Sequence, residues 1–100
     1  MIRFEWDESK NKINIQKHNV DFSEAMTIFF DENGIIIDDK EHSQEEERYL
    51  LIGSSSKAKI LVVCYCCREN DEVIRIISSR KATKNERKQY FERLEVEYEA

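Results

Sequence analysis

The sequence predicts an α+β domain of two layers, with two helices before a four-stranded antiparallel sheet and one helix after it. The middle of the chain holds short stretches of apolar, largely β-branched residues separated by turn-forming residues, a pattern typical of strands. Apolar residues at helical spacing, preceded by capping residues, flank these stretches. With 100 residues, 40% of them hydrophobic, the chain can bury one modest core. We therefore expect a single domain over residues 1–100.

A short strand and a polar helix are predicted at the start of the chain. Residues 2–6 alternate apolar with polar side chains, which indicates a strand. Asp7 can cap the following helix, because its carboxylate can accept hydrogen bonds from free amides of the first turn. The helix over residues 8–18 has little apolar anchor beyond Ile13, so we expect it to lie on the surface or to line a cleft. Asn19 suits the left-handed position that ends a helix.

A heavy apolar stripe predicts a second helix, over residues 22–30. Asp21 is a suitable cap for it. The apolar side chains recur at the spacing of one helix face, and we interpret them as core residues rather than as a cofactor site. They are Phe22, Met26, Phe29 and Phe30.

Four strands are predicted in the middle of the chain, and we expect consecutive ones to pair as an antiparallel meander. The acidic residues 38–47 between the first and second strands are interpreted as a solvated loop. The strands are residues 35–37, 48–53, 60–68 and 73–79.

The turn between the last two strands fixes which residues face each other. Asn70 and Asp71 both tolerate positive φ, so they can form a two-residue hairpin turn. Arg68 then lies opposite Val73, and Arg68 and Arg75 share one face of the sheet as diagonal neighbours. A shift of one residue in this register would separate the two arginines.

The last strand leads through a basic corner into the C-terminal helix. Thr83 and Glu86 form a capping box, which predicts a helix over residues 84–94. We expect residues 95–100 to fray. Two interpretations of the corner remain, a solvated basic face and an anion site where arginines meet a helix N-terminus. The helix is expected to bury Tyr90, Phe91 and Leu94, and the basic residues are Arg80, Lys81, Lys84, Arg87 and Lys88.

Charge is unevenly distributed along the chain, whose net charge is −5. Residues 31–47 hold eight acids against one lysine, and residues 68–88 hold seven bases against four acids. A dipolar surface of this kind can offer one face to a phosphate and another to a basic partner.

Several classes of protein are excluded by composition. No apolar run approaches the length of a membrane span, and the N-terminus lacks the apolar segment of a signal peptide, so we expect a cytoplasmic protein without membrane association. The three cysteines, Cys64, Cys66 and Cys67, are crowded into one strand and suit neither a disulfide framework nor a zinc site. We interpret them as reduced core residues and expect no metal and no cofactor.

An ordered set of short motifs runs from residue 4 to about residue 90. It comprises Phe4-x-Trp6-Asp7-Glu8-x-Lys10, Asn14-x-x-Lys17-His18, Val20-x-Phe22-x-x-Ala25, Glu47-Arg48, Gly53, Arg75-Ile76-Ile77-Ser78-x-Arg80-x-Ala82 and Glu86-Arg87-x-x-Tyr90. In this set the chain resembles the BrnT toxins, the ribonuclease halves of bacterial type II toxin–antitoxin pairs. The resemblance implies a RelE-like fold, RNA cleavage that halts translation, and neutralisation by a tightly bound BrnA antitoxin. In such a hetero-oligomer the antitoxin binds operator DNA, so the toxin meets DNA only indirectly.

The resemblance also implies a chemistry. RelE-like ribonucleases use no metal: the 2′-OH of the RNA attacks the adjacent phosphate, and the protein moves protons and offsets the charge of the phosphorane. Arginines suit the phosphate, whereas a lysine or histidine can move a proton. Glu47 could act as a base or orient Arg48. The candidate site residues are therefore Lys17, His18, Glu47, Arg48, Arg75 and Arg80.

Structural interpretations stand beside these roles. His18 at a helix C-terminus can simply compensate the helix dipole, and Glu47 with Arg48 can form a structural ion pair. Tyr90 could serve as a reserve acid and Trp6 could stack on a base, but the spacing of both favours the core.

An alternative function is also open. A protein with the same fold could cleave RNA weakly or not at all and act mainly as a corepressor together with its DNA-binding antitoxin. The acidic net charge is the feature of the sequence that favours this alternative.

Overall fold

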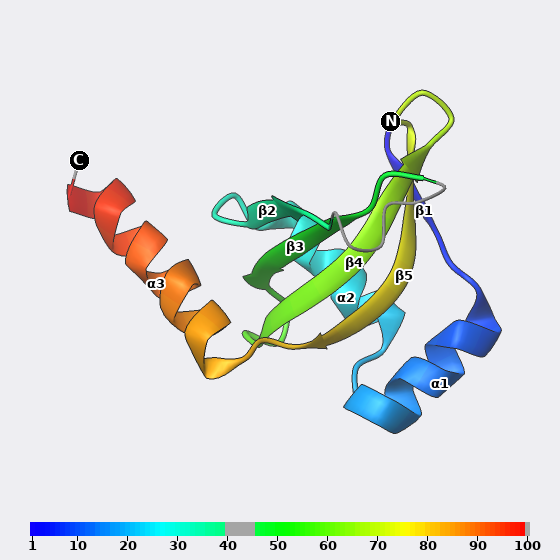
Figure 1. Cartoon of the computed structure of the whole chain (residues 1–100), viewed down its shortest axis with the longest axis horizontal. Coiled ribbons are helices and arrows are strands. Elements are labelled where there is room, and N and C mark those ends of the chain that lie inside the picture. Colours follow the sequence, from blue (N-terminus) through cyan, green and yellow to red (C-terminus); the bar gives the residue numbers. More distant parts are fainter. Residues whose placement is uncertain (40–45, 100) are drawn as a thin grey trace.

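The fold is described from a computed structural model, which covers residues 1–39 and 46–99 and the side chains through residue 95. Most of the predicted acidic loop therefore lies outside the described residues. Figure 1 shows the elements, which in chain order are β1 (Arg3–Glu5), α1 (Glu8–His18), α2 (Phe22–Thr27), the 3₁₀ turn η1 (Ile28–Phe30), β2 (Ile35–Asp38), β3 (Tyr49–Ser54), β4 (Ile60–Arg68), β5 (Val73–Lys81) and α3 (Lys84–Glu99).

The sheet has five strands in the order β1-β5-β4-β3-β2. The antiparallel meander of β2 to β5 matches the prediction, but β1 joins the sheet as well and runs parallel to β5. The prediction of a four-stranded antiparallel sheet was therefore wrong. Alternation of side chains marks a strand but does not reveal its partner, and the partner of β1 lies about 70 residues away along the chain.

The hairpin between β4 and β5 has the predicted register. Arg68 faces Val73, and Cys66 faces Arg75, so Arg68 and Arg75 lie on the same face. Asn70 and Asp71 have the predicted positive φ values, 57° and 67°, but Glu69 also has a positive φ of 52°. The residues between the strands, 69–72, form a turn closed by the amide of Glu72, which donates to the carbonyl of Glu69 at 3.1 Å.

A bulge interrupts the same pair of strands further along. Cys64 faces Ser78, whereas Tyr65 faces Ile76, so Ile77 is an extra residue on β5. Bulges of this kind redirect side chains and are frequent beside functional sites.

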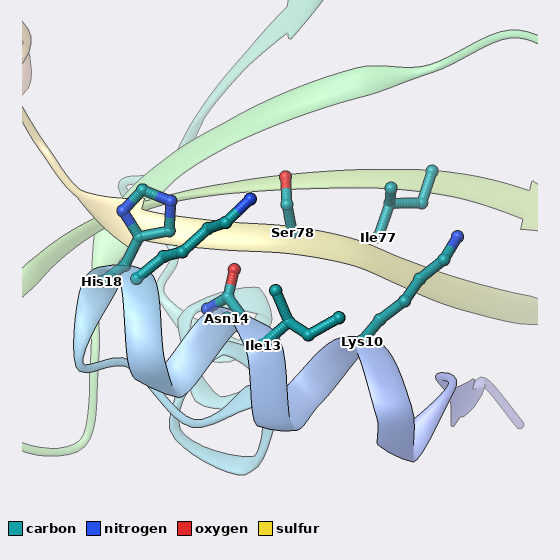
Figure 2. Close-up of a pocket in the computed structure, with 7 residues that line it drawn as sticks. Lys10, Ile13, Asn14, His18, Ile77 and Ser78 are labelled. Carbon is teal, nitrogen blue, oxygen red and sulfur yellow. The ribbon is translucent and has the colours of Figure 1, made fainter.

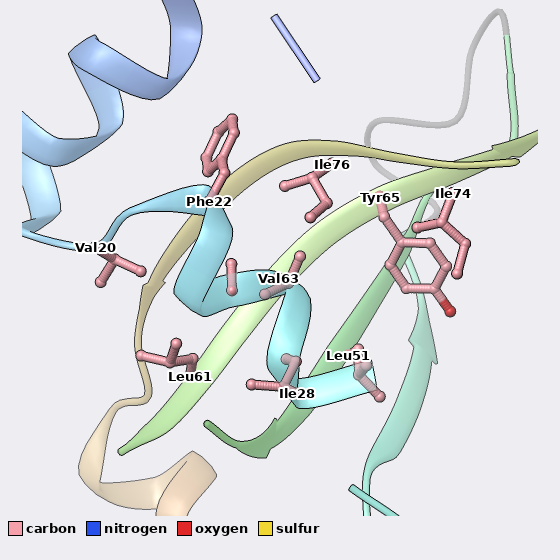
Figure 3. Close-up of a cluster of buried hydrophobic side chains, with 10 residues drawn as sticks. Val20, Phe22, Ile28, Leu51, Leu61, Val63, Tyr65, Ile74 and Ile76 are labelled. Carbon is pink, nitrogen blue, oxygen red and sulfur yellow. The ribbon is translucent and has the colours of Figure 1, made fainter. Parts of the chain in front are cut away.

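The main core lies between one face of the sheet and the segment formed by α2 and η1. In Figure 3, Phe22 and Ile28 of this segment face side chains of β3, β4 and β5. The predicted helix 22–30 changes to a 3₁₀ turn after Thr27, and this change rotates Phe30 away from the core, leaving it 73% exposed. The buried residues of this core are Val20, Phe22, Ala25, Ile28, Leu51, Leu61, Val63, Tyr65, Ile74 and Ile76.

Helix α1 is held to the domain by polar side chains rather than by the predicted apolar anchor. Ile13 is 50% exposed, whereas Asn11 and Asn14 are buried. The Asn14 amide donates to the carbonyl of Val20 at 2.9 Å and accepts from the amide of Ser79 at 3.0 Å. A helix with little apolar surface can therefore pack against β5, because buried asparagines satisfy backbone groups on the neighbouring segments.

Both ends of α1 are capped as predicted. The Asp7 carboxylate accepts from the amides of Ser9 and Lys10, and these hydrogen bonds lower its pKa. Asn19 has φ 56° and ψ 35°, the left-handed conformation, and its amide donates to the carbonyl of Ile15.

Helix α3 contacts the other face of the sheet and extends five residues beyond the predicted end, to Glu99. Tyr90 is buried with Ile52 and Val62, whereas Phe91, which was predicted to be buried, is 45% exposed. Only one side of α3 meets the sheet, and Figure 1 shows the helix projecting away from it. Tyr90 and Leu94, four residues apart, pack in the cluster with Ile52 and Val62, whereas Phe91 lies at the edge of the contact and lines a depression beside Ile60 and Lys81.

The carboxylate of Asp31 ties α3 to the rest of the domain. It accepts a hydrogen bond from the Tyr90 hydroxyl at 2.6 Å and another from the amide of Ser54 at 2.8 Å. Burial by itself would raise the pKa of Asp31, but these bonds and one from the amide of Asn33 lower it below its ordinary value. Gly53 lets β3 lie close to η1 and to Asp31, since a Cβ there would lie 3.2 Å from Cβ of Ile28 and 3.4 Å from Oδ2 of Asp31.

Candidate functional site

Two of the predicted arginines face the same depression on the sheet. This depression, which we call the arginine cleft, has a volume of about 410 Å³ and lies on the face opposite α2. Arg48 immediately precedes β3, and Arg80 lies near the end of β5. The antiparallel pairing of β3, β4 and β5 brings them together although they are far apart in sequence. The cleft is lined by Asp39, Arg48, Leu50, Cys64, Ile77, Ser78 and Arg80.

Arg80 is held at the cleft by Glu86. Its guanidinium donates through Nη1 at 2.7 Å and through Nη2 at 3.0 Å to the two oxygens of that carboxylate. Glu86 also completes the predicted capping box, since it accepts from the amide of Thr83 at 2.8 Å while the Thr83 hydroxyl accepts from the amide of Glu86 at 3.2 Å. The bonds from Arg80, and to a lesser degree those from Thr83, lower the pKa of Glu86 to about 2. The ion pair therefore fixes the position of the Arg80 guanidinium, and it also neutralises part of its positive charge.

Cys64 contributes a small, unreactive wall to the cleft. Burial, reinforced by the carboxylate of Asp39, raises the pKa of the Cys64 thiol to about 11, so the thiol stays protonated near neutral pH. Its Sγ lies 3.9 Å from Oδ2 of Asp39. The three cysteines are free; Cys64 and Cys66 are buried as predicted, but Cys67 is exposed.

Lys17 and His18 lie in a neighbouring depression, between α1 and β5. This α1 pocket has a volume of about 180 Å³. Figure 2 shows the side chains of α1 rising toward Ile77 and Ser78 of β5. Because both depressions are lined by Ile77 and Ser78, the bulged stretch of β5 forms the wall between them. The α1 pocket is lined by Lys10, Ile13, Asn14, Lys17, His18, Ile77 and Ser78.

The other two predicted site residues line neither depression. Glu47 is exposed and accepts a hydrogen bond from the Tyr49 hydroxyl at 2.7 Å, which raises the pKa of Tyr49 to about 12. Arg75 forms an ion pair with Glu5 of β1, with Nη1 and Oε1 3.4 Å apart. The pairing of β1 with β5, which the sequence did not reveal, thus supplies Arg75 with a partner.

The aromatic residues with two interpretations belong to the core. Tyr90 is buried, and its hydroxyl is bonded to Asp31. Trp6 packs edge-on against Phe22, with ring centroids 6.2 Å apart, and its indole donates to Glu8 at 2.6 Å.

Four polar residues that line the two depressions were not among the candidate site residues: Lys10, Asn14, Asp39 and Ser78. Lys10 lies two helical turns before Lys17, so its spacing on one helix face could have revealed it. Asn14 and Ser78 stand in the motifs that carry the family resemblance, whereas Asp39 carried no signal. The positions of Asp39 and Ser78 depend on the pairing of β2 with β3 and on the bulge in β5, which are long-range features.

Residues 1–39 and 46–99 contain neither a metal-binding cluster nor a membrane-spanning helix. Within those ranges, no three histidine, cysteine or acidic residues cluster in a way that could hold a metal ion. No helix found there is both long enough and apolar enough to cross a bilayer.

The fold and the two depressions define a small α+β protein whose sheet carries a basic cleft beside a lysine- and histidine-bearing helix. Residues 6–86 match the sequence model of a family described as the ribonuclease toxin BrnT of type II toxin–antitoxin systems. The chain therefore belongs to the BrnT family, and the resemblance inferred from its motifs is confirmed.

The fold is also similar to a solved structure of that name. A 1.1 Å crystal structure of the Brucella abortus ribonuclease toxin BrnT superposes with a TM-score of 0.63 and 23% sequence identity. The match covers 84% of this chain and 100% of the Brucella chain. Among proteins with curated functions, none matches this sequence.

Proposed function

We propose that this BrnT-family toxin is an endoribonuclease that inhibits translation by cleaving RNA. In this reaction the 2′-OH of the RNA attacks the adjacent phosphate. The observation that carries the proposal is the convergence of Arg48 and Arg80 on one cleft, beside a pocket that holds Lys17 and His18. Two guanidinium groups can contact the non-bridging oxygens of a phosphate and stabilise the extra negative charge of the transition state.

The proposed step needs two proton transfers and no other reactant. The 2′-oxygen bonds to phosphorus as the bond to the 5′-oxygen breaks, leaving a 2′,3′-cyclic phosphate and a free 5′-OH. One group must take the proton of the 2′-OH and another must protonate the leaving oxygen. We assign these roles to groups that line the two depressions, namely Asp39 in the arginine cleft and Lys17 or His18 in the α1 pocket.

In this scheme Glu47 and Arg75 do not contact the phosphate that is attacked. Neither lines a depression, and each has a partner elsewhere, the hydroxyl of Tyr49 and the carboxylate of Glu5. Asp39, which lines the cleft, takes in this scheme the role of base that the sequence suggested for Glu47.

We further propose that a BrnA-type antitoxin neutralises the chain in the cytoplasm and links it to operator DNA. Family membership supports an antitoxin partner. Co-expression with the antitoxin gene, if one adjoins the toxin gene, should relieve growth arrest and yield a complex on copurification. An adjacent protein that neither binds nor protects would contradict this part of the proposal.

One observation favours the alternative, a corepressor that cleaves poorly. The guanidinium of Arg80 is bonded through two nitrogens to Glu86, which reduces the charge available to a phosphate. The two functions differ in what the native chain does alone. A corepressor should leave both growth and RNA intact while still binding its antitoxin.

The proposal is tested by incubating the purified protein with a 5′-labelled RNA in the presence of EDTA. We expect cleavage products that end in a 2′,3′-cyclic phosphate. Arg48→Ala should reduce the cleavage rate by roughly 10²- to 10³-fold, the usual loss when one group that stabilises the transition state is removed. Arg68→Ala is the matched control, because Arg68 is a strand arginine outside both depressions and pairs with Glu46.

Two results would contradict the proposal. One is an intact RNA with the folded native protein. The other is an equal loss of activity in Arg48→Ala and Arg68→Ala, which would point to general loss of positive charge rather than to the cleft.

A further inference from the structure

We propose that a depression at the base of α3 is a second RNA site, which binds a nucleotide of single-stranded RNA beside the segment held in the arginine cleft. This α3 depression has a volume of about 360 Å³. Lys59, Lys81 and Arg87 line it together with the ring of Phe91, over an apolar floor that includes Ile60 and Ala82. The inference rests on the proposed function in naming RNA as the ligand.

Among the described side chains, none neutralises the positive charge of the α3 depression. No acidic residue lines it, and in the described part of the chain Lys59, Lys81 and Arg87 form no ion pair. Nearby bases behave differently, since Arg80 pairs with Glu86 and Lys88 pairs with Glu92. Three unpaired cations around one hollow suit an anion from outside, such as a backbone phosphate.

The aromatic ring of the depression is held in a fixed orientation. Phe91 stands at 82° to the ring of Tyr90, with centroids 5.4 Å apart. Tyr90 is in turn fixed by its hydrogen bond to Asp31. A large apolar side chain that is 45% exposed beside cations contributes little to folding, but its free face can stack on a nucleotide base.

Lys59 is presented by a rigid turn. Ala58 adopts a positive φ of 59°, and the amide of Ser55 donates to the carbonyl of Lys59 at 2.8 Å. The hydroxyl of Ser55 accepts from the amide of Lys59 at 3.3 Å and donates to the buried carboxylate of Glu24 at 2.7 Å. This turn fixes the backbone of Lys59 beside the end of β5 and reduces the ordering that binding would require.

The α3 depression lies within reach of a strand bound in the arginine cleft. Ser78 and Arg80 line the cleft, and Lys81 and Ala82 line the depression, so the two hollows follow one another along β5. Ala82 continues the face of β5 that carries Ser78 and Arg80, because its amide extends the ladder to Ile60, and it lies about 13 Å from Ser78, four residues of a strand. A short length of single-stranded RNA can therefore contact both.

The lining of the α3 depression distinguishes between two classes of ligand. An acidic protein segment would also suit three cations, but it would gain little from an exposed aromatic face. The combination of cations with an aromatic ring favours single-stranded nucleic acid.

The test measures binding of a fluorescent, fully 2′-O-methylated RNA oligonucleotide by anisotropy at several salt concentrations. The missing 2′-OH prevents cleavage, so binding is measured whether or not the protein is a nuclease. We expect Phe91→Leu, which keeps apolar volume but removes the aromatic face, to weaken binding by roughly five-fold or more. Arg87→Ala should lower the slope of log K against log salt by about 0.7, the value for one lost phosphate contact on a single strand.

Lys88→Ala is the matched control, since it removes the same charge from the adjacent, ion-paired position of α3. Thermal unfolding should show that all three variants are folded. Equal binding by Arg87→Ala, Lys88→Ala and the native protein would overturn the inference. So would an unchanged affinity of Phe91→Leu, or displacement of the RNA by poly-glutamate at equal charge concentration, which would indicate an acidic protein as the ligand.

Cleavage provides a separate readout. If the proposed function holds, Arg87→Ala should slow cleavage of a long RNA but leave a dinucleotide substrate unaffected, because a dinucleotide cannot reach the α3 depression. If the native protein binds the methylated RNA through Arg87 and Phe91 but cleaves nothing, the proposed function fails while the second RNA site stands.

Discussion

The two oxygens of the Glu86 carboxylate accept hydrogen bonds from two different nitrogens of Arg80, at 2.7 and 3.0 Å. One of these oxygens also accepts from the amide of Thr83 at the start of α3. A single acid therefore fixes both an arginine of the cleft and the helix that contributes Arg87 and Phe91 to the α3 depression. Any change at Glu86 should be felt at both hollows.

The pH dependence of stability should reflect this pair. The pKa of Glu86 is about 2 in the folded protein, below its ordinary value of 4.5. Its contribution to stability is therefore present above about pH 4.5 and is lost as the pH falls toward 2. We expect Glu86→Gln to unfold with a free energy that depends less on pH in this window. The difference should be on the order of 1–2 kcal/mol, because the partly exposed partner Arg80 is screened by solvent.

Urea unfolding of both proteins at pH 7 and pH 3 measures this difference. Glu8→Gln is the control. Glu8, like Glu86, is an acid in the first turn of a helix, but it forms no ion pair in the described part of the chain. Parallel pH profiles for native protein and Glu86→Gln would contradict the prediction.

The buried amide of Asn14 should be worth more than the apolar side chain next to it. Asn14→Leu leaves the amide of Ser79 and the carbonyl of Val20 without their partner. We expect a loss of about 1–3 kcal/mol in the free energy of unfolding, the cost of a buried unsatisfied polar group. Ile13→Ala, at an exposed position, should change it by less than about 0.5 kcal/mol. The reverse order in urea titrations would show that α1 is held by Ile13 after all.

Tyr90→Phe separates the hydrogen bond of α3 from its packing. The ring stays buried, but Asp31 loses its bond from the hydroxyl. Unfolding free energy should fall by about 1.5–3 kcal/mol, as for a bond to a charged group. The pKa of Asp31 should rise, because burial raises it and one of the hydrogen bonds that lower it is then missing. NMR titration of the Asp31 carboxylate checks the second effect, and an unchanged pKa would contradict it.

The hairpin turn offers a stabilising substitution. Asp71 holds a positive φ of 67°, a conformation that glycine adopts without strain. Asp71→Gly produces the Asn-Gly pair favoured in two-residue hairpins and should raise the free energy of unfolding by about 0.5–1 kcal/mol. Asp71→Ala removes the same carboxylate but keeps a Cβ, so it should not stabilise. Equal effects of the two would attribute the change to charge rather than to backbone conformation.

Proton transfer from the α1 pocket is tested by Lys17→Met and His18→Gln. If one of them moves a proton during cleavage, its replacement should slow the reaction by about 10²-fold or more. Lys12→Met is the control, because Lys12 lies on the same helix outside the pocket. Full activity in both single variants would exclude the proposed role of the pocket.

Local features of this fold could be read from the sequence, whereas features that join distant segments could not. Asp7, Asn19 and the capping box of Thr83 act as predicted, because each depends only on neighbouring residues. The partner of β1 and the bulge at Ile77 depend on pairing across the chain, for which periodicity carries no signal.

The same distinction applies to the site. The sequence predicted Arg48 and Arg80 as candidates, but that they line one cleft follows from the strand order. Phe30 and Phe91 were predicted as core from their spacing. A 3₁₀ turn displaced the first, and contact of α3 with the sheet on one side only displaced the second. In both cases the apolar pattern predicted a wider buried helix face than the neighbouring elements cover.

The position of β5 between β1 and β4 has a consequence for synthesis of the toxin. β5 is the last strand to leave the ribosome, yet it lies inside the sheet and carries Ser78 and Arg80. A nascent chain that ends before Val73 has neither a complete sheet nor a complete cleft, and β1 must wait for a partner made some 70 residues later. The cell is therefore exposed to a finished toxin only when translation of the chain is nearly over. Ribosome-bound chains truncated at residue 72 should be cleaved readily by protease, and protection equal to that of the released full chain would contradict this order.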